Sequence, residues 1–242
     1  MFQGVLQKML SEWGDPIRYY LPMRGDYIQV NSLLDKEISL QFMGFECMHC
    51  GENKPIFRQG YCKECFFEVP QTADWVMHPE LSKAHLNIED RDLGYEQQVQ
   101  LQPHYVYLAN SSDVKVGVTR KTQAPTRWID QGAHEALVLA EVPNRYLAGV
   151  AEVALKEHLA DKTNWRKMLT NQLTPVDLLR VKLEVRDFLP DEIQPYITED
   201  IVPLQIHFPV LKYPTQVRSL QLLQTPTYRG RLMGIKGQYL IF

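Results

Sequence analysis

The sequence has no hydrophobic run long enough to cross a membrane. A transmembrane helix needs about 20 consecutive apolar residues, and no stretch of this 242-residue chain approaches that length. The N-terminus also lacks the basic-then-apolar pattern of a secretory signal peptide. No large excess of charge is present either, because 26 Lys and Arg oppose 29 Asp and Glu. We therefore expect a cytoplasmic globular protein without membrane contact, and not one wholly devoted to nucleic acid.

Cysteine is scarce, and all four cysteines fall in two C-x-x-C pairs, Cys47 with Cys50 and Cys62 with Cys65. Thiolates at this spacing can surround one tetrahedral ion, and two such pairs complete a four-sulfur zinc site. Two disulfides are the alternative, but they require an oxidising compartment. We predict a zinc-ribbon-like segment over residues 45–68. Its zinc is structural, because a closed four-cysteine shell leaves no position for substrate.

The central segment, residues 104–169, has the clearest pattern of secondary structure. Two short runs rich in β-branched and aromatic residues, 105–109 and 114–119, flank the polar turn 110–113. This composition predicts a β-hairpin. Apolar residues then recur at helical spacing from Tyr146 to His158, which predicts an amphipathic helix. A segment that contains an arginine lies between the hairpin and the helix.

These residues resemble the core of the GIY-YIG endonuclease superfamily. The triplet ending at Tyr107 stands in the place of GIY, and the triplet from Lys115 to Gly117 stands in the place of YIG. Arg127 follows Gly117 by ten residues, as the arginine of that family does, and Glu152 stands in the place of its metal-binding glutamate. With the cysteine pairs and the closing GIKGQYLIF, the whole chain is similar to a bacterial family defined as a domain of unknown function.

The resemblance implies a metal-dependent phosphodiesterase that acts on DNA or RNA. Tyr107 would position or activate the water, Lys115 and Arg127 would hold phosphate oxygens, and Glu152 would hold one Mg²⁺ or Mn²⁺ ion. Structural roles remain open for each: Tyr107 as a core aromatic, Arg127 as a partner of Asp130, and Glu152 as an ordinary helical glutamate. The lysine at 115 counts against activity, because lysine is a poor base at its usual pKa near 10.

Three functions remain open: a nuclease, a non-catalytic nucleic-acid-binding protein on a degenerate GIY-YIG-like fold, and a protein-interaction module. Residues 1–103 hold fifteen acidic and nine basic side chains, and residues 104–169 hold seven and nine. A phosphate-binding surface is therefore expected on the central segment. A Glu152 that points into a packed core, or that pairs with Arg145 or Lys156, would argue against the nuclease.

The remaining segments predict an α+β fold. Residues 1–44 contain an expected helix near residues 5–13 and strand-like runs at 17–21, 27–30 and 38–42, while proline divides residues 201–242 into short strands. We expect an N-terminal β segment (1–44), the zinc segment (45–68), a linker (69–103), a GIY-YIG-like core with an antiparallel sheet and helices (104–200), and a C-terminal β segment (201–242) that pairs with residues 1–44 in a small antiparallel β-barrel. The sequence predicts no oligomeric state.

Overall fold

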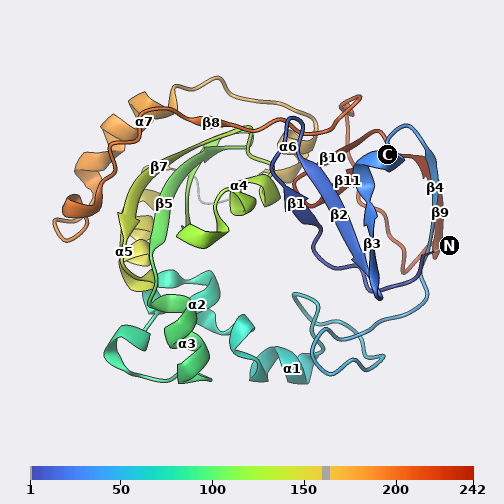
Figure 1. Ribbon diagram of the computed structural model, residues 1–242, viewed down its shortest axis with the longest axis horizontal. Coiled ribbons are helices and arrows are strands. Elements are labelled where there is room, and N and C mark those ends of the chain that lie inside the picture. Colours follow the sequence, from blue (N-terminus) through green and yellow to red (C-terminus); the bar gives the residue numbers. More distant parts are fainter. Residues whose placement is uncertain (1, 160–163) are drawn as a thin grey trace.

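The computed structural model describes residues 2–159 and 164–242. The fold is mixed α+β, and its largest sheet, four-stranded and antiparallel, lies in the left half of Figure 1. Its strands are β5 (His104–Asn110), β6 (Val114–Arg120), β7 (Glu135–Val142) and β8 (Leu204–Gln205), in the order β6-β5-β7-β8. The predicted hairpin is confirmed, because β5 and β6 pair along their whole length on either side of the polar turn.

Two helices cover opposite faces of this sheet. Successive side chains of a strand point to opposite faces, so Val106 and Val116 pack under α5 (Arg145–Lys156), whose small and apolar residues they contact. Tyr107 points to the other face, into a core shared with α4 (Thr126–Asp130). The predicted helix is thus confirmed as α5. It starts at Asn144, whose side chain accepts a hydrogen bond from the backbone N–H of Leu147, a typical N-cap.

The segment between the cysteines and the central sheet is helical and packs against α5. The other helices are α1 (Lys63–Glu68), α2 (Asp74–Met77), α3 (Leu93–Gln100), α6 (Trp165–Leu169) and α7 (Leu178–Val185), with 3₁₀ turns η1 (Val30–Leu33), η2 (Pro70–Thr72), η3 (Pro79–Leu81), η4 (Ala84–Leu86), η5 (Lys121–Gln123), η6 (Arg186–Phe188) and η7 (Gln194–Tyr196). Gly149 allows η3 to approach α5, because a Cβ there would overlap the backbone nitrogen of Glu80. Within the described residues, none of the helices has the length and apolar character needed to span a bilayer.

The N- and C-terminal segments form three small sheets. The first contains β1 (Leu10–Glu12), β2 (Arg18–Met23) and β3 (Asp26–Gln29); the second pairs β4 (Glu37–Gln41) with β9 (Thr227–Arg231); the third pairs β10 (Gly234–Lys236) with β11 (Tyr239–Ile241). The predicted closed barrel is therefore not formed among the described residues. Four prolines between residues 203 and 226 cannot donate to a strand ladder, and this stretch contributes only β8.

The helix expected near residues 5–13 is also wrong. Residues 10–12 instead form β1, which pairs with β2. Both terminal segments then reach α4. The Gln238 side chain accepts a hydrogen bond from the backbone N–H of Met9 (2.7 Å) and donates one to Asp130 (2.8 Å), and Lys8 forms an ion pair with Asp130. Helix α4 is thus held by residues from both ends of the sequence.

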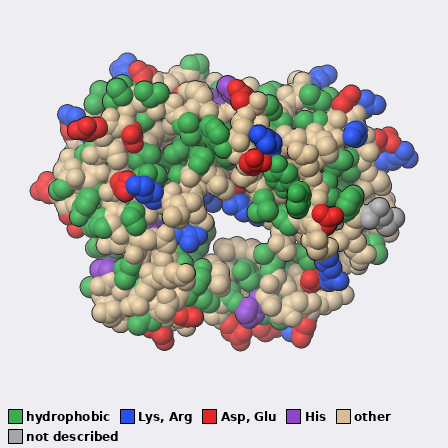
Figure 2. All heavy atoms as spheres, in the orientation of Figure 1, with side chains coloured by type: hydrophobic (Ala, Val, Ile, Leu, Met, Phe, Trp, Pro, Cys, Tyr) green, Lys and Arg blue, Asp and Glu red, His purple; other side chains and the backbone are tan. Residues whose placement is uncertain are grey.

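An opening passes through the molecule in Figure 2, with several Lys and Arg side chains along its border. In the same orientation, Figure 1 has α4 above this opening and α1 and α2 below it. The opening therefore separates the central sheet from the segment that carries the cysteines.

Candidate metal centre and phosphate-binding site

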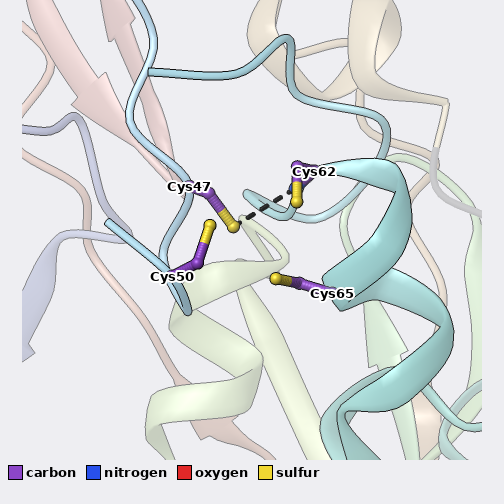
Figure 3. A group of neighbouring side chains, drawn as sticks. All are labelled: Cys47, Cys50, Cys62 and Cys65. Atoms are coloured by element: carbon purple, nitrogen blue, oxygen red, sulfur yellow. Dashed lines mark hydrogen bonds between the residues drawn. The ribbon is translucent and has the colours of Figure 1, made fainter. Parts of the chain in front are cut away.

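The four cysteines converge on one point. Their sulfur atoms all lie within 4.8 Å of one another, and Figure 3 shows Cys47 and Cys50 on a loop facing Cys62 and Cys65 at the start of α1. Sulfurs bound to zinc at about 2.3 Å in a tetrahedron lie roughly 3.8 Å apart, which this arrangement accommodates. None of the four is disulfide-bonded. The four cysteines are therefore placed to hold a metal ion such as zinc.

Backbone groups favour the ionised form of one of the four cysteines, Cys47. Gly51 and Gly60 take positive φ values of 72° and 88° beside the two pairs, a conformation that suits glycine. The backbone N–H of Cys62 points at the Cys47 sulfur at 3.3 Å (dashed in Figure 3). Burial opposes ionisation of Cys47, but such N–H groups outweigh burial and lower the pKa of its thiol to about 6. The thiolate, which is the form that binds metal, is thus favoured at this position.

A second candidate site lies around Tyr107, in the central sheet. Tyr107 is fully buried, and its hydroxyl accepts a hydrogen bond from Gln131 Nε2 at 2.8 Å. Gly117 is its partner on β6. A Cβ at position 117 would lie 2.7 Å from the Tyr107 hydroxyl oxygen, so glycine leaves the space that the tyrosine needs. The ring of Trp128 packs against Tyr107 edge to face at 5.7 Å.

The fold brings Arg127 on α4 and Glu152 on α5 close to this tyrosine. Burial raises the pKa of Tyr107, the charge of Arg127 lowers it, and the charge of Glu152 raises it further. Because charge interactions weaken with distance, these shifts indicate that both charges act within range of the Tyr107 hydroxyl. Lys115 is buried and lies two residues from Gly117 on the same face of β6, about 7 Å along the strand. The charges of Arg127 and Glu152 thus both act on Tyr107, and Lys115 lies further along β6.

Glu152 is paired with a cation and Tyr107 is buried. The Glu152 carboxylate is mostly buried, and its Oε2 lies 3.4 Å from Lys156 Nζ. Burial raises the pKa of Glu152, while Lys156 and Arg145 lower it. This is the pairing that the sequence identified as evidence against a nuclease. Tyr107 is buried with a raised pKa, so it is a poor general base near neutral pH.

Glu80 was missed by sequence reasoning because it belongs to a segment predicted to be a linker. It lies on η3, which Gly149 brings against α5. Its charge raises the pKa of Glu152, and its Oε2 is buried without a hydrogen-bond partner among the described residues. A glycine within the amphipathic helix was the signal that could have indicated this close approach.

Positive charge is concentrated around Arg145, at the N-terminal end of α5. Arg145 donates from Nε to the carbonyl of Trp75 (3.1 Å) and from Nη2 to that of Val76 (2.7 Å). Burial is the main cause that lowers the pKa of Arg145 to about 10, and the charges of Arg120 and Arg127 add to it, while Glu152 opposes it. Within residues 2–159 and 164–242, neither Arg120 nor Arg127 forms an ion pair. Sequence reasoning had identified Lys115 and Arg127 as phosphate ligands, but neither Arg120 nor Arg145.

A comparison with known protein families assigns the chain to one family. The model of a family described as a protein of unknown function (DUF2797) matches residues 35–242. The chain belongs to the DUF2797 family. No curated protein and no solved structure matches it.

The matched region of this DUF2797 protein contains both candidate sites. It starts at Asp35, so β1–β3 lie outside it, whereas the four cysteines and the residues around Tyr107 lie inside. The predicted similarity to a domain of unknown function is therefore confirmed. The GIY-YIG resemblance rests on the residues quoted from the sequence.

Proposed function

We propose that this DUF2797 protein binds the phosphate backbone of a nucleic acid, DNA or RNA, along β6, on a fold arranged like the GIY-YIG core. The single observation that carries the proposal is the guanidinium of Arg127, which forms no ion pair among the described residues. Its charge acts on Arg145 and on Tyr107. A guanidinium matches the geometry of phosphate oxygens through two parallel hydrogen bonds.

The order of the elements supports the same proposal. A β-hairpin is followed by the helix with Arg127, then by β7, then by the helix with Glu152. This order agrees with the resemblance that the sequence suggested. The Lys and Arg side chains along the opening in Figure 2 add a positive surface through which a negatively charged strand can approach.

Binding is favoured over cleavage by the contacts of Glu152. Mg²⁺ or Mn²⁺ is usually held by one or two carboxylates and several waters, and Glu152 with Glu80 would supply those carboxylates. The donor set fits such an ion only if Lys156 leaves Glu152, because an ammonium 3.4 Å away competes for the same oxygen. The bound ion would stabilise charge on a phosphate. In the observed pairing Lys156 neutralises that carboxylate.

The metal of the cysteine site is proposed to be zinc with a structural role. Four thiolates form a soft ligand set that suits Zn²⁺. With all four positions filled by sulfur, the ion has none left for substrate. It would hold the loop with Cys47 to the start of α1, and thereby fix the lower border of the opening.

A binding and cleavage experiment tests the proposal. Labelled single-stranded, duplex and structured nucleic acids are mixed with the wild type, Arg127→Gln and Glu152→Gln, with Mg²⁺ or Mn²⁺ and without. We expect salt-sensitive binding without cleavage, several-fold weaker in Arg127→Gln and retained in Glu152→Gln. Arg180→Gln is the matched control, because Arg180 is exposed on α7 and paired with Glu184 at 2.8 Å.

Two results would overturn the proposal. Cleavage by the wild type that both substitutions abolish would identify a metal-dependent nuclease, in which the ion displaces Lys156. Absence of both binding and cleavage would leave the protein-interaction module as the function.

A further inference from the structure

Helix α6 packs on the hairpin of β10 and β11, and an aromatic pair lies at this contact. Met168 and Leu169 of α6 share a buried cluster with Ile241 of β11. The rings of Trp165 and Tyr239 are parallel to within 8°, and their centroids are 6.1 Å apart. Tyr239 is 40% exposed, so part of this aromatic side chain is accessible to a ligand.

The same aromatic pair orients a cation. The guanidinium of Arg166 lies over the Trp165 ring, 4.4 Å from its centroid, and it forms no ion pair or side-chain hydrogen bond among the described residues. The N–H donors of a guanidinium lie in its plane, so a guanidinium that stacks on a ring keeps these donors for an anion. Lys167, the next residue, is instead paired with Asp113 at 3.2 Å. Arg166 is thus the cation of α6 that is available to a ligand.

Arg166 lines a polar groove beside this helix, which we call the α6 groove. The groove has a volume of about 350 Å³, and Thr215, Gln216 and Val217 line it as well. Val217 and Trp165 pack on the same buried cluster, so the groove and the aromatic pair are adjacent. The described residues that line the groove include two cations and no carboxylate. Small-molecule sites usually measure about 300–1,000 Å³, so the α6 groove has room for one small anionic group such as a nucleotide.

A buried lysine adds positive charge next to the α6 groove. Lys236 of β10 is fully buried, and its Nζ donates a hydrogen bond to Asn171 Oδ1 at 3.1 Å. Asn171 stands between Thr170 and Gln172, which both line the groove. Burial lowers the pKa of Lys236 to about 8, so the amine is still mostly charged near neutral pH. It forms no ion pair within the described part of the chain, and its field therefore favours an anion in the groove.

We propose that the α6 groove binds an unpaired nucleotide of a single strand, with its phosphate at Arg166 and its base against the ring of Tyr239. Proteins that bind single strands combine a positive groove with aromatic side chains on which bases stack, and this surface has both. The bases of a duplex are already stacked on one another, so the groove gives the protein a preference for single strands. The inference rests on the proposed function in that the ligand is a nucleic acid, but it uses none of the residues around Tyr107.

Fluorescence anisotropy with a labelled single strand and with a labelled duplex tests the inference. Tyr239→Ala is expected to weaken single-strand binding on the order of tenfold, whereas Tyr239→Phe keeps the ring and retains binding; neither should change duplex binding. Arg166→Gln should reduce the slope of log Kobs against log salt by about 0.7 for the single strand. Arg186→Gln is the control, because Arg186 is exposed and paired with Asp187 at 3.4 Å, and it should bind as the wild type does.

The outcomes separate the inference from the proposed function. Wild-type single-strand binding in Arg166→Gln or Tyr239→Ala, beside weaker binding in Arg127→Gln, overturns the α6 groove and leaves the proposed function intact. Weaker binding in the two groove variants, beside wild-type binding in Arg127→Gln, supports the groove and overturns the proposed function. A nucleoside monophosphate that competes as well as an unlabelled single strand would assign the groove to a free nucleotide and overturn the strand. Circular dichroism with heating shows whether Tyr239→Ala is folded, and Tyr239→Leu, which keeps an apolar side chain without a ring, takes its place if it is not.

Discussion

The cysteine site and the site around Tyr107 differ in how much of the chain is needed to build them. All four cysteines lie between residues 47 and 65, on one loop and the start of one helix. The residues around Tyr107 come from η3, two strands and two helices, from Glu80 to Glu152. A site of the first kind depends on local spacing, whereas one of the second kind depends on the packing of the whole fold.

Substitution of one cysteine should have the largest effect of the changes proposed here. This effect, on zinc content and on folding, should be confined to residues 45–68. Cys62→Ser replaces a buried metal-binding thiol, and metal binding contributes on the order of 10 kcal/mol to the folding of small zinc domains. We expect the zinc content to fall from about one ion per chain to nearly none, and residues 45–68 to become sensitive to protease. Metal analysis and limited proteolysis measure the two effects.

His49→Ala is the control for this change, because His49 lies between Cys47 and Cys50 and is exposed. It should keep the zinc. If Cys62→Ser also abolished nucleic-acid binding by a fully folded central sheet, the two sites would not be independent and the comparison would fail.

Acid should act mainly on the site around Tyr107, through His104. Its folded pKa of about 4 lies below the ordinary 6.5, so between these values the unfolded state binds more protons, and the free energy of unfolding falls as the pH is lowered from 6.5 to 4. A shift of this size corresponds to about 3 kcal/mol. Urea unfolding across this pH range should show a shallower pH dependence in His104→Gln than in the wild type.

His207→Gln serves as the matched histidine control, because His207 is exposed beside Asp15. Its pH dependence should follow that of the wild type. Release of metal from the cysteines in acid affects all three proteins alike, so the difference between them reports on His104. Equal slopes in all three would show that His104 does not stay neutral in the folded protein.

Gly149→Ala should produce the smallest of these effects, and it tests the long-range packing. A methyl group there overlaps the backbone of η3, and overpacking costs about 1–3 kcal/mol, partly offset by the better helix propensity of alanine, about 1 kcal/mol. We expect a net loss of about 1 kcal/mol in urea unfolding, together with weaker nucleic-acid binding.

Gly94→Ala on α3 is the opposite case, since the only contact of an added Cβ there is with Asp92 Oδ1 at 3.5 Å. It should stabilise the protein slightly. A stabilised Gly149→Ala would mean that η3 can move away from α5, and that the position of Glu80 is not fixed by this packing.

The same difference between local spacing and long-range packing separates what could be predicted from the sequence from what could not. The cysteine pairs, the β5–β6 hairpin and α5 rest on local spacing and periodicity, and the structure contains each of them. The charges of Arg127 and Glu152 both act on Tyr107, and only the family resemblance suggested that these three residues are related. Glu80 was not predicted, because nothing in a short proline-containing segment indicates which helix the segment will contact.

The errors also have physical causes. The expected helix near residues 5–13 does not form, because residues 10–12 pair with β2 as strand β1. Local propensity does not include such a tertiary contact. The expected barrel failed because a strand ladder needs N–H groups that the prolines between 203 and 226 lack. Both errors concern segments whose structure is determined by distant partners.

The attachment of α4 has a consequence for the order in which the chain folds. The helix that carries Arg127 is tied through Asp130 to Lys8 and Gln238, and Gln238 also bonds to Met9, 229 positions away in sequence. Contacts between residues so far apart form slowly, because a long loop must close first. During synthesis on a ribosome, the hairpin and α5 can therefore form early, whereas α4 is secured only after residue 238 has emerged. A partly synthesised chain would carry the strands of the proposed phosphate-binding site before Arg127 is held in place.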